Sequence, residues 1–134
     1  MKRIGLLSDT HGYFDERYFT HFASCDEIWH CGDIGSDDLA ERLAAFRPLR
    51  AVYGNIDGGA VRFNYSEFLA FRCEEVNVLM THIGGYPGRY SPQAYRKILA
   101  DKPNLFVCGH SHILKVQYDN ALQMLTMNPG AAGI

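Results

Sequence analysis

Short apolar runs alternate with amphipathic segments along the first half of the chain. Residues 4–7 form a continuous apolar run, which is typical of a strand covered on both faces. We expect a helix from about residue 14 to 23, a strand at 27–31, a helix that begins after the N-cap Ser36, and a strand at 49–53. This β-α-β-α-β order predicts a largely parallel sheet, in which ligands bind beyond the carboxyl ends of the strands.

The second half has a different pattern. Runs at 67–72 and 76–80 predict a hairpin, and Ser91-Pro92 predicts the start of a helix that reaches about residue 100. A strand at 105–108 follows, and residues 114–118 and 121–127 predict a last hairpin around Asp119-Asn120. The chain is therefore expected to be an α/β protein, and its 134 residues favour a single domain.

The composition argues against several classes of function. The formal net charge is -2, from 13 Lys+Arg and 15 Asp+Glu, without a run of like charge, so no nucleic-acid surface or polybasic membrane patch is expected. No apolar stretch is long enough for a signal peptide or a membrane span, which predicts a soluble, cytoplasmic protein. The 4 cysteines lack CxxC spacing, which favours reduced, packed thiols over disulfides or a zinc cluster.

Metal-competent side chains follow five of the predicted strands. They are Asp9, His11, Asp33, Asn55, His82, His110 and His112. Each one alone has an ordinary structural explanation, such as a helix cap or a turn. Their coincidence at strand ends, four of which carry a glycine, favours a common site. If residues 110–112 are extended, the imidazoles of His110 and His112 point to the same side.

The ligand types restrict the metal. Seven oxygen and nitrogen ligands are too many for one tetrahedral zinc but suit two divalent cations that share a carboxylate. Carboxylate, amide and imidazole ligands without thiolate favour Mn, Fe, Zn or Ni over magnesium and copper(I). The sequence therefore predicts a dinuclear metal centre.

Five ordered motifs carry a family resemblance: Asp-x-His, Gly-Asp, Gly-Asn-x-Asp, Thr-His and Gly-His-x-His, followed by Asn-Pro-Gly. Together they resemble the calcineurin-like metallophosphoesterases, and above all their small single-domain branch of bacterial and archaeal phosphodiesterases. The resemblance implies two β-sheets packed face to face and flanked by helices. It also implies a metal-dependent phosphodiesterase with two divalent ions, Mn first among them, and a hydroxide that bridges them as the nucleophile. The expected substrate is a small phosphodiester or phosphomonoester.

The resemblance also implies a role for each ligand. One ion would be held by Asp9, His11, Asp33 and His112, and the other by Asp33, Asn55, His82 and His110. Asp33 would bridge the two ions, and Asp33, Asn55 and His82 would take part in catalysis.

Two residues in glycine-rich loops are candidates for substrate contacts. Arg89 is the stronger of them, because its planar guanidinium matches phosphate oxygens, and Tyr13 is the other. His30 could either support the bridging carboxylate or pack beneath the site.

The sequence departs from the family pattern in three places. Ile56 stands where many relatives have a histidine that acts as leaving-group acid, although Asp57 next to it could take that part. Gly84 stands where many have a second histidine. Members of the small branch usually continue for another strand or two after Asn-Pro-Gly, so we expect the single domain over 1–134 either to be a shortened member or to come from an incomplete sequence.

Two other functions compete with the enzyme. The first is a non-catalytic metal-binding scaffold for protein partners, as in the retromer subunit of this fold; the complete set of seven ligands favours the enzyme. The second is a metal-independent hydrolase, but the chain has no Gly-x-Ser-x-Gly elbow.

Overall fold

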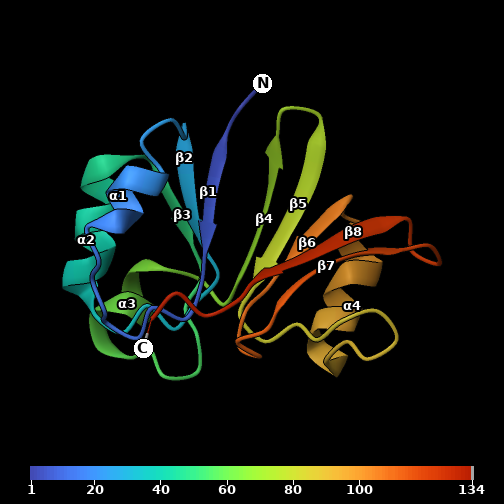
Figure 1. The fold of residues 1–134 in the computed structure, drawn as a ribbon. Helices are drawn as coiled ribbons and strands as arrows, with labels where there is room; N and C mark the ends of the chain where they lie inside the picture. The colour runs from blue at the N-terminus through green and yellow to red at the C-terminus, as the bar shows by residue number, and fades with distance from the viewer. Residues whose placement is uncertain (134) are drawn as a thin grey trace.

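The computed structural model describes residues 1–133 and is shown in Figure 1. In the first half, the elements are β1 (Ile4–Leu7), α1 (Arg17–His21), β2 (Glu27–His30), α2 (Asp37–Phe46), β3 (Leu49–Ala51) and α3 (Gly59–Asn64). In the second half, they are β4 (Phe68–Cys73), β5 (Val76–Thr81), α4 (Pro92–Asp101), β6 (Leu105–Val107), β7 (Leu114–Asp119) and β8 (Met124–Pro129). Within these residues no helix is long and apolar enough to span a bilayer.

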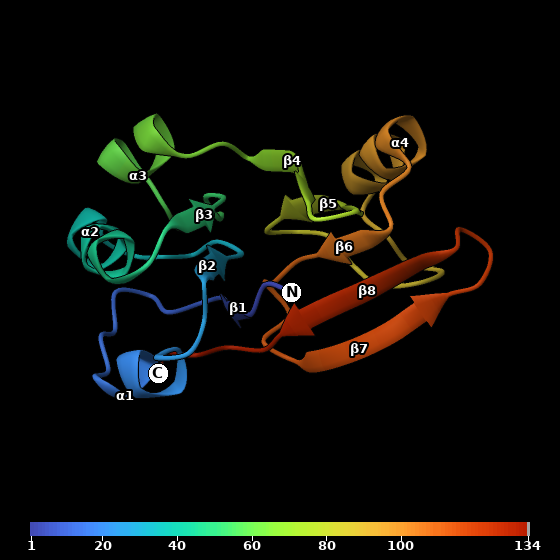
Figure 2. The same cartoon turned by 90° about the horizontal axis from the view of Figure 1, so that it is seen from above.

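The strands form two sheets. Parallel β1, β2 and β3 make a 3-stranded sheet, as the β-α-β-α-β pattern predicts. The other sheet has 5 strands in the order β4-β5-β6-β8-β7, in which β5, β6 and β8 are parallel and the outer strands β4 and β7 are antiparallel to their neighbours. Figure 2 shows helices on the outer side of each sheet, so the predicted α/β architecture of two facing sheets flanked by helices is confirmed.

Alternation along the strands separates three apolar layers. Trp29, Val78 and Met80 are buried between the two sheets. The neighbouring residue Ile28 faces the other way, toward α1 and α2, and Leu79 packs against α4. Because each fully buried side chain of this size contributes about 1.5–3 kcal/mol, these layers fix the relative position of the two sheets and of their carboxyl ends.

Helices α2 and α4 begin in the loops that follow β2 and β5. The hydroxyl of Ser36 accepts a hydrogen bond from Leu39 N at 3.2 Å, and the hydroxyl of Ser91 accepts one from Ala94 N at 3.3 Å. Pro92 is the first residue of α4. The predicted N-caps are therefore confirmed, and they anchor the loops after β2 and β5.

Three elements differ from the prediction. α1 is only 5 residues long, since the carboxylate of Asp15 accepts a hydrogen bond from Arg17 N at 2.9 Å and the helix begins there. α3 was not predicted, because it is a short helix with one buried apolar residue and no side-chain cap. The last hairpin has a longer turn, closed by a hydrogen bond from Leu122 N to Asp119 Oδ1 at 3.1 Å, so β8 begins at Met124.

Candidate metal centre

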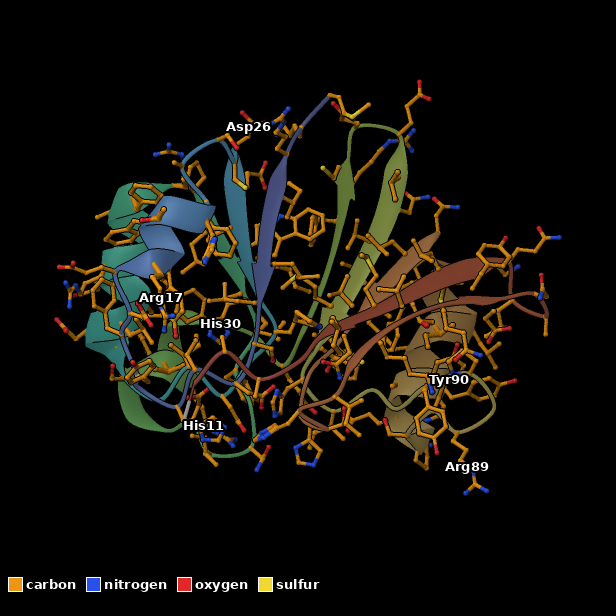
Figure 3. All side chains as sticks on the ribbon, in the orientation of Figure 1. His11, Arg17, Asp26, His30, Arg89 and Tyr90 are labelled. Carbon is orange, nitrogen blue, oxygen red and sulfur yellow. The ribbon has the colours of Figure 1, made fainter. Side chains whose placement is uncertain are left out.

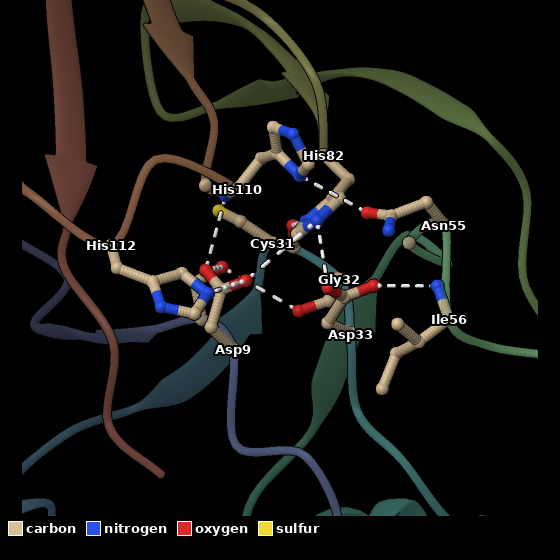
Figure 4. Close-up of polar contacts among 12 residues, drawn as sticks. Asp9, Cys31, Gly32, Asp33, Asn55, Ile56, His82, His110 and His112 are labelled. Atoms are coloured by element: carbon tan, nitrogen blue, oxygen red, sulfur yellow. Dashed lines mark hydrogen bonds and ion pairs between the residues drawn. The ribbon is translucent and has the colours of Figure 1, made fainter. Parts of the chain in front are cut away.

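The loops that follow strands of both sheets meet at one edge of the molecule, in the lower part of Figure 1. The structure brings the seven predicted ligands together there (Figure 4). Asp9, His11 and His112 form one group, and Asp33, His82 and His110 form the other; within each group the ligand atoms all lie within 4.8 Å of one another. Asn55 joins the second group, because its Oδ1 is 3.1 Å from His110 Nδ1.

The centre has a buried floor and an exposed rim. Asp9, Asp33 and His82 are almost completely buried, with 0 to 2% of their surface exposed. The side chains at the rim are accessible to solvent. They are His11, Asn55, His110 and His112. A molecule from solution can therefore reach the centre from the rim, while the carboxylates below it are held in the protein interior.

The carboxylate of Asp33 lies between the two groups. Its Oδ2 is 3.1 Å from His82 Nε2 in one group and 3.7 Å from His11 Nε2 in the other. Its Oδ1 accepts a hydrogen bond from Ile56 N at 3.1 Å. Both groups can therefore share this one carboxylate.

Two buried atoms in the floor have no hydrogen-bond partner among the described residues: Asp9 Oδ1 and His82 Nε2. His82 Nδ1 lies 2.8 Å from Cys31 O, and since a carbonyl can only accept, Nδ1 carries the proton of the neutral ring. The lone pair of His82 Nε2 then faces Asp9 Oδ1 at 3.7 Å. Two buried lone pairs face each other favourably only across a cation or a proton, so these residues fit a divalent metal ion.

The backbone at the centre is strained. Five of the seven ligand residues have a positive φ: Asp9, His11, Asp33, His110 and His112, with values of 50° to 72°. Such conformations cost of the order of 1–3 kcal/mol each and gather at functional sites. Residues 110–112 are not extended, because both histidines have a positive φ, so the condition under which their imidazoles would point to the same side is not met. Consequently His110 faces Asn55 and His82, whereas His112 Nε2 lies 3.2 Å from Asp9 Oδ1.

Glycines let the loops approach the carboxylates. A side chain at Gly54 would overlap the carboxylate of Asp33, and one at Gly109 would overlap the hydroxyl of Ser8. That hydroxyl donates a hydrogen bond to Asp9 Oδ2 at 2.6 Å, and His110 N donates another at 3.1 Å. The loops after β1 and β6 are thereby joined through Asp9.

Asp57 supports the centre from below, a role that the sequence did not reveal. Its carboxylate is buried and accepts hydrogen bonds from Ile34 N at 3.1 Å, Gly35 N at 2.8 Å and Gly54 N at 2.9 Å. These donors belong to the two loops that carry Asp33 and Asn55. Because both carboxylate oxygens are occupied inside the protein, Asp57 is not available as the leaving-group acid that its place beside Ile56 had made possible.

Asn128 plays a similar part in the second sheet. Its amide nitrogen donates to Gly109 O and to the hydroxyl of Ser111, both at 3.0 Å, and its oxygen accepts from Gly130 N at 2.9 Å. The Asn-Pro-Gly motif was the only sequence signal for it. Asn128 therefore holds the loop that carries His110 and His112.

His30 packs beneath the centre, the second of its two predicted places (Figure 3). Gly32 N donates to its Nδ1 at 3.1 Å, so its Nε2 donates to the hydroxyl of Thr10 at 2.9 Å, which in turn donates to Ile34 O at 2.9 Å. Burial lowers the pKa of His30 to about 4. The ring therefore stays neutral and links the loops after β1 and β2.

Two neighbouring cavities lie beside the second ligand group, and Ile83 and Ser91 are in the walls of both. One of about 430 Å³ lies beside His110, and one of about 450 Å³ lies beside Asn55 and His82. Arg89 lines the first, and Figure 3 shows it extending outward from the loop after β5. Tyr13 is half-exposed in the loop after β1 and lines neither of these two cavities.

The two substituted motif positions have different surroundings. The side chain of Ile56 is 50% exposed beside the centre, where a larger polar side chain would have space. A Cβ at Gly84 would come within 2.7 Å of Cys108 Cβ and of the Phe106 ring. A histidine at position 84 would therefore require the strand-end packing to move.

Comparison with known proteins agrees with this geometry. The chain matches the calcineurin-like phosphoesterase superfamily domain over residues 1–134. It belongs to this superfamily. A probable metallophosphoesterase of Methanocaldococcus jannaschii is 26% identical over 135 residues, which cover 96% of this chain and 67% of that protein.

Solved structures of calcineurin-like phosphoesterase folds superpose well on the chain. A novel archaeal phosphodiesterase gives a TM-score of 0.76 at 22% identity, covering 98% of this chain and 84% of that one. Wild-type Vps29 of Entamoeba histolytica, solved as a complex with Zn²⁺, gives a TM-score of 0.76 at 14% identity, covering 96% and 74%. At these identities the likeness shows the fold alone, and the resemblance in the sequence motifs is confirmed at the level of the superfamily.

Proposed function

We propose that this protein hydrolyses phosphodiesters with two divalent metal ions. The observation that carries the proposal is the buried pair of Asp9 Oδ1 and His82 Nε2, which face each other at 3.7 Å without hydrogen-bond partners among residues 1–133. Five further metal-competent side chains surround this pair. A chain that merely needed a stable strand end would not retain two unpaired buried acceptors that face each other.

The two groups divide the ligands between the ions. Asp9, His11 and His112 would hold one ion, His82, His110 and Asn55 would hold the other, and Asp33 would serve both. Bound divalent cations supply Lewis-acid chemistry, since they polarise phosphoryl oxygens and lower the pKa of water. Mixed oxygen and nitrogen ligands suit Mn, Fe, Zn and Ni, and among these the family resemblance makes Mn the first choice.

The chain's own residues orient this chemistry. Asp57, Asn128 and His30 hold the ligand loops by hydrogen bonds, so the ligands are positioned before a substrate arrives. The exposed imidazoles at the rim form the entrance for the phosphoryl group. No side chain is required as nucleophile, because metal ions held by the buried carboxylates would lower the pKa of a bound water.

The arrangement of the cavities favours a diester over a monoester. A phosphodiester carries an organic group on each side of phosphorus, and the two cavities offer one space beside His110 and another beside Asn55. A monoester would fill only one of them. A monoester also carries a second negative charge on its phosphoryl group. Among the described residues, no lysine or arginine lies within 4 Å of the Asp9 and Asp33 carboxylates to offset that charge.

The test combines metal content with hydrolysis. The chain is stripped, loaded with Mn²⁺ and assayed by elemental analysis and with bis-p-nitrophenyl phosphate and p-nitrophenyl phosphate. We expect two ions per chain and faster hydrolysis of the diester. His82→Ala should lose an ion and most activity, whereas His21→Ala, an exposed histidine on α1, should change neither. Failure to hydrolyse either ester with any divalent metal, in protein that holds two ions, would contradict the proposal.

One observation favours a second function, a scaffold that binds protein partners. Large apolar side chains are exposed along β7: Leu114 at 72%, Val116 at 59% and Tyr118 at 49%. Such a row is unusual for a surface that contacts only water. A chain that binds two metal ions, hydrolyses no phosphoester and retains this row would fit the scaffold better than the enzyme.

A further inference from the structure

We propose that the cavity beside His110 binds the organic group of the substrate, and that it prefers a group with an aromatic, apolar body and a negative charge at its far end. We name this cavity the Tyr86 pocket. Its walls include Ile83, Tyr86, Arg89, His110, Ile113 and Lys115. The inference rests on the proposed phosphoesterase activity and adds to it a class of substrate.

The position of the Tyr86 pocket places it next to the reacting group. His110 and its neighbours Gly109 and Ser111 form one of its walls, and His110 is a member of the second ligand group. A phosphoryl group held by the metal centre would therefore have its ester oxygen at the mouth of the pocket. The volume of about 430 Å³ lies within the range of roughly 300–1,000 Å³ that small-molecule sites occupy.

The walls of the pocket are mainly apolar. Ile83 is 45% exposed and Ile113 64% exposed, although both are large aliphatic side chains beside a polar centre. The ring of Tyr86 is 43% exposed, and Met127 and Cys108 complete the lining. Burial of these surfaces by an aromatic ring would remove apolar area from water and offer stacking on Tyr86.

The charged residues of the pocket have only one sign. Arg89 and Lys115 line it, and no aspartate or glutamate is among its lining residues. Within residues 1–133, neither side chain forms an ion pair with a carboxylate; Lys115 Nζ instead lies 4.2 Å from the centre of the Tyr86 ring. Lys115 comes from β7 and holds its ammonium group against the Tyr86 ring, whereas Arg89 lines the pocket from the loop after β5 with its side chain extended outward.

The second cavity, beside Asn55 and His82, has charged residues of both signs. It contains Arg62 and Arg96 but also Glu67, and the guanidinium of Arg62 already donates to the backbone oxygen of Asp57. Its charges are therefore mixed and partly used within the chain. Selection for an anionic group belongs to the Tyr86 pocket.

The test uses two diesters that share the leaving group p-nitrophenolate: p-nitrophenyl phenyl phosphate and p-nitrophenyl 4-carboxyphenyl phosphate. For the Mn²⁺-loaded chain we expect kcat/KM to be about tenfold higher for the carboxylated diester, mainly through a lower KM, since one charge-assisted contact distinguishes them. Lys115→Met should abolish most of this preference, and Arg89→Met should reduce it. Lys97→Met removes the same charge from α4 outside the pocket and should leave the preference intact.

A binding measurement separates this inference from the proposed function. Calorimetric titration compares benzylphosphonate with 4-carboxybenzylphosphonate, neither of which the protein can hydrolyse. We expect tighter binding of the carboxylated compound and loss of the difference in Lys115→Met. Hydrolysis of both diesters with equal KM, or equal binding of both phosphonates, would overturn the pocket assignment while leaving the phosphoesterase intact. Absence of hydrolysis together with a charge preference in binding would overturn the phosphoesterase and not the pocket.

Discussion

The two ends of the first sheet treat buried carboxylates in opposite ways. At the amino end, Glu27 receives hydrogen bonds from Lys2 Nζ at 2.6 Å, Arg50 Nε at 3.0 Å and Trp29 Nε1 at 3.1 Å. Burial alone would raise its pKa, but these donors together lower the pKa to about 2. At the carboxyl end, no lysine or arginine of residues 1–133 lies within 4 Å of the carboxylates of Asp9 and Asp33.

The contrast between the two ends of the sheet indicates which buried carboxylates need a bound metal ion. A buried ion costs several kcal/mol unless it is paired, and the chain supplies its own cations for Glu27. Asp9 and Asp33 face imidazoles, one of which, His82, presents a lone pair. Among the described residues no lysine or arginine offsets their charge, whereas a bound cation could do so. Burial of carboxylates therefore indicates stability at one end of the sheet and metal binding at the other.

The change expected to have the largest effect is Asp33→Asn. An amide cannot supply the charge that two cations share, so we expect loss of at least one metal ion and a fall in hydrolysis of roughly 10³-fold, equivalent to about 4 kcal/mol in the barrier. The metal-free variant should melt at or above the temperature of the parent, because one buried charge is gone. Elemental analysis and thermal melts give both readouts. Two ions held as tightly as in the parent would mean that Asp33 does not bridge them.

Asp57→Ala tests a third way of stabilising a buried carboxylate, by backbone N–H groups alone. Removal of the acceptor leaves three buried donors from two loops unpaired, and we expect the free energy of unfolding to fall by about 3 kcal/mol in the metal-free chain. Urea unfolding measures this value. Asp57→Asn keeps one acceptor and should lie between the parent and the alanine variant. Equal stability of all three would show that the loops are held by other contacts.

The sequence predicted that the seven candidate ligand side chains lie together, and there is a physical reason why this could be predicted. Residues that follow neighbouring parallel strands meet at one edge whatever the details of their loops, so Asp9 and Asp33 could be placed together from hydrophobic patterning. His82 follows a strand of the other sheet, and its place beside them followed from the family resemblance. The N-caps Ser36 and Ser91 were predictable because a hydroxyl in that position satisfies a free backbone donor.

Predictions that depended on loop conformation were less successful. The extended geometry considered for 110–112 does not occur, since His110 and His112 both have a positive φ and belong to different ligand groups. The buried position of Asp57 depends on contacts between two loops, which no local pattern specifies. Helix α3 was missed because packing of Val61, rather than an amphipathic repeat, stabilises it.

The stabilisation by Glu27 at the amino end of the sheet is expected to depend on pH. Its pKa of about 2 in the folded chain lies below the ordinary value of 4.5, so its stabilising contribution is complete above pH 4.5 and is lost as the pH falls toward 2. By linkage we expect a loss of about 2 kcal/mol in the free energy of unfolding over that range, after allowance for the half-exposed Lys2 and Arg50. Urea unfolding of the parent and Glu27→Gln at several pH values measures it. A variant with the same pH dependence as the parent would remove Glu27 from the explanation.

The smallest effect is expected for Asn128→Ala, because Asn128 holds the exposed imidazoles and not a buried anion. The substitution removes the donor to the buried Gly109 O and to the hydroxyl of the exposed Ser111, and we expect a loss of about 1 kcal/mol in stability. Metal binding should weaken severalfold, because His110 and His112 lose their support while Asp9 and Asp33 keep theirs. Unfolding of the metal-free chain and a competition titration with a chelator separate the two effects. A loss of stability as large as that of Asp57→Ala would show that the loop of His110 and His112 is held as firmly as the buried floor. The distinction between the buried floor and the exposed rim would then have to be abandoned.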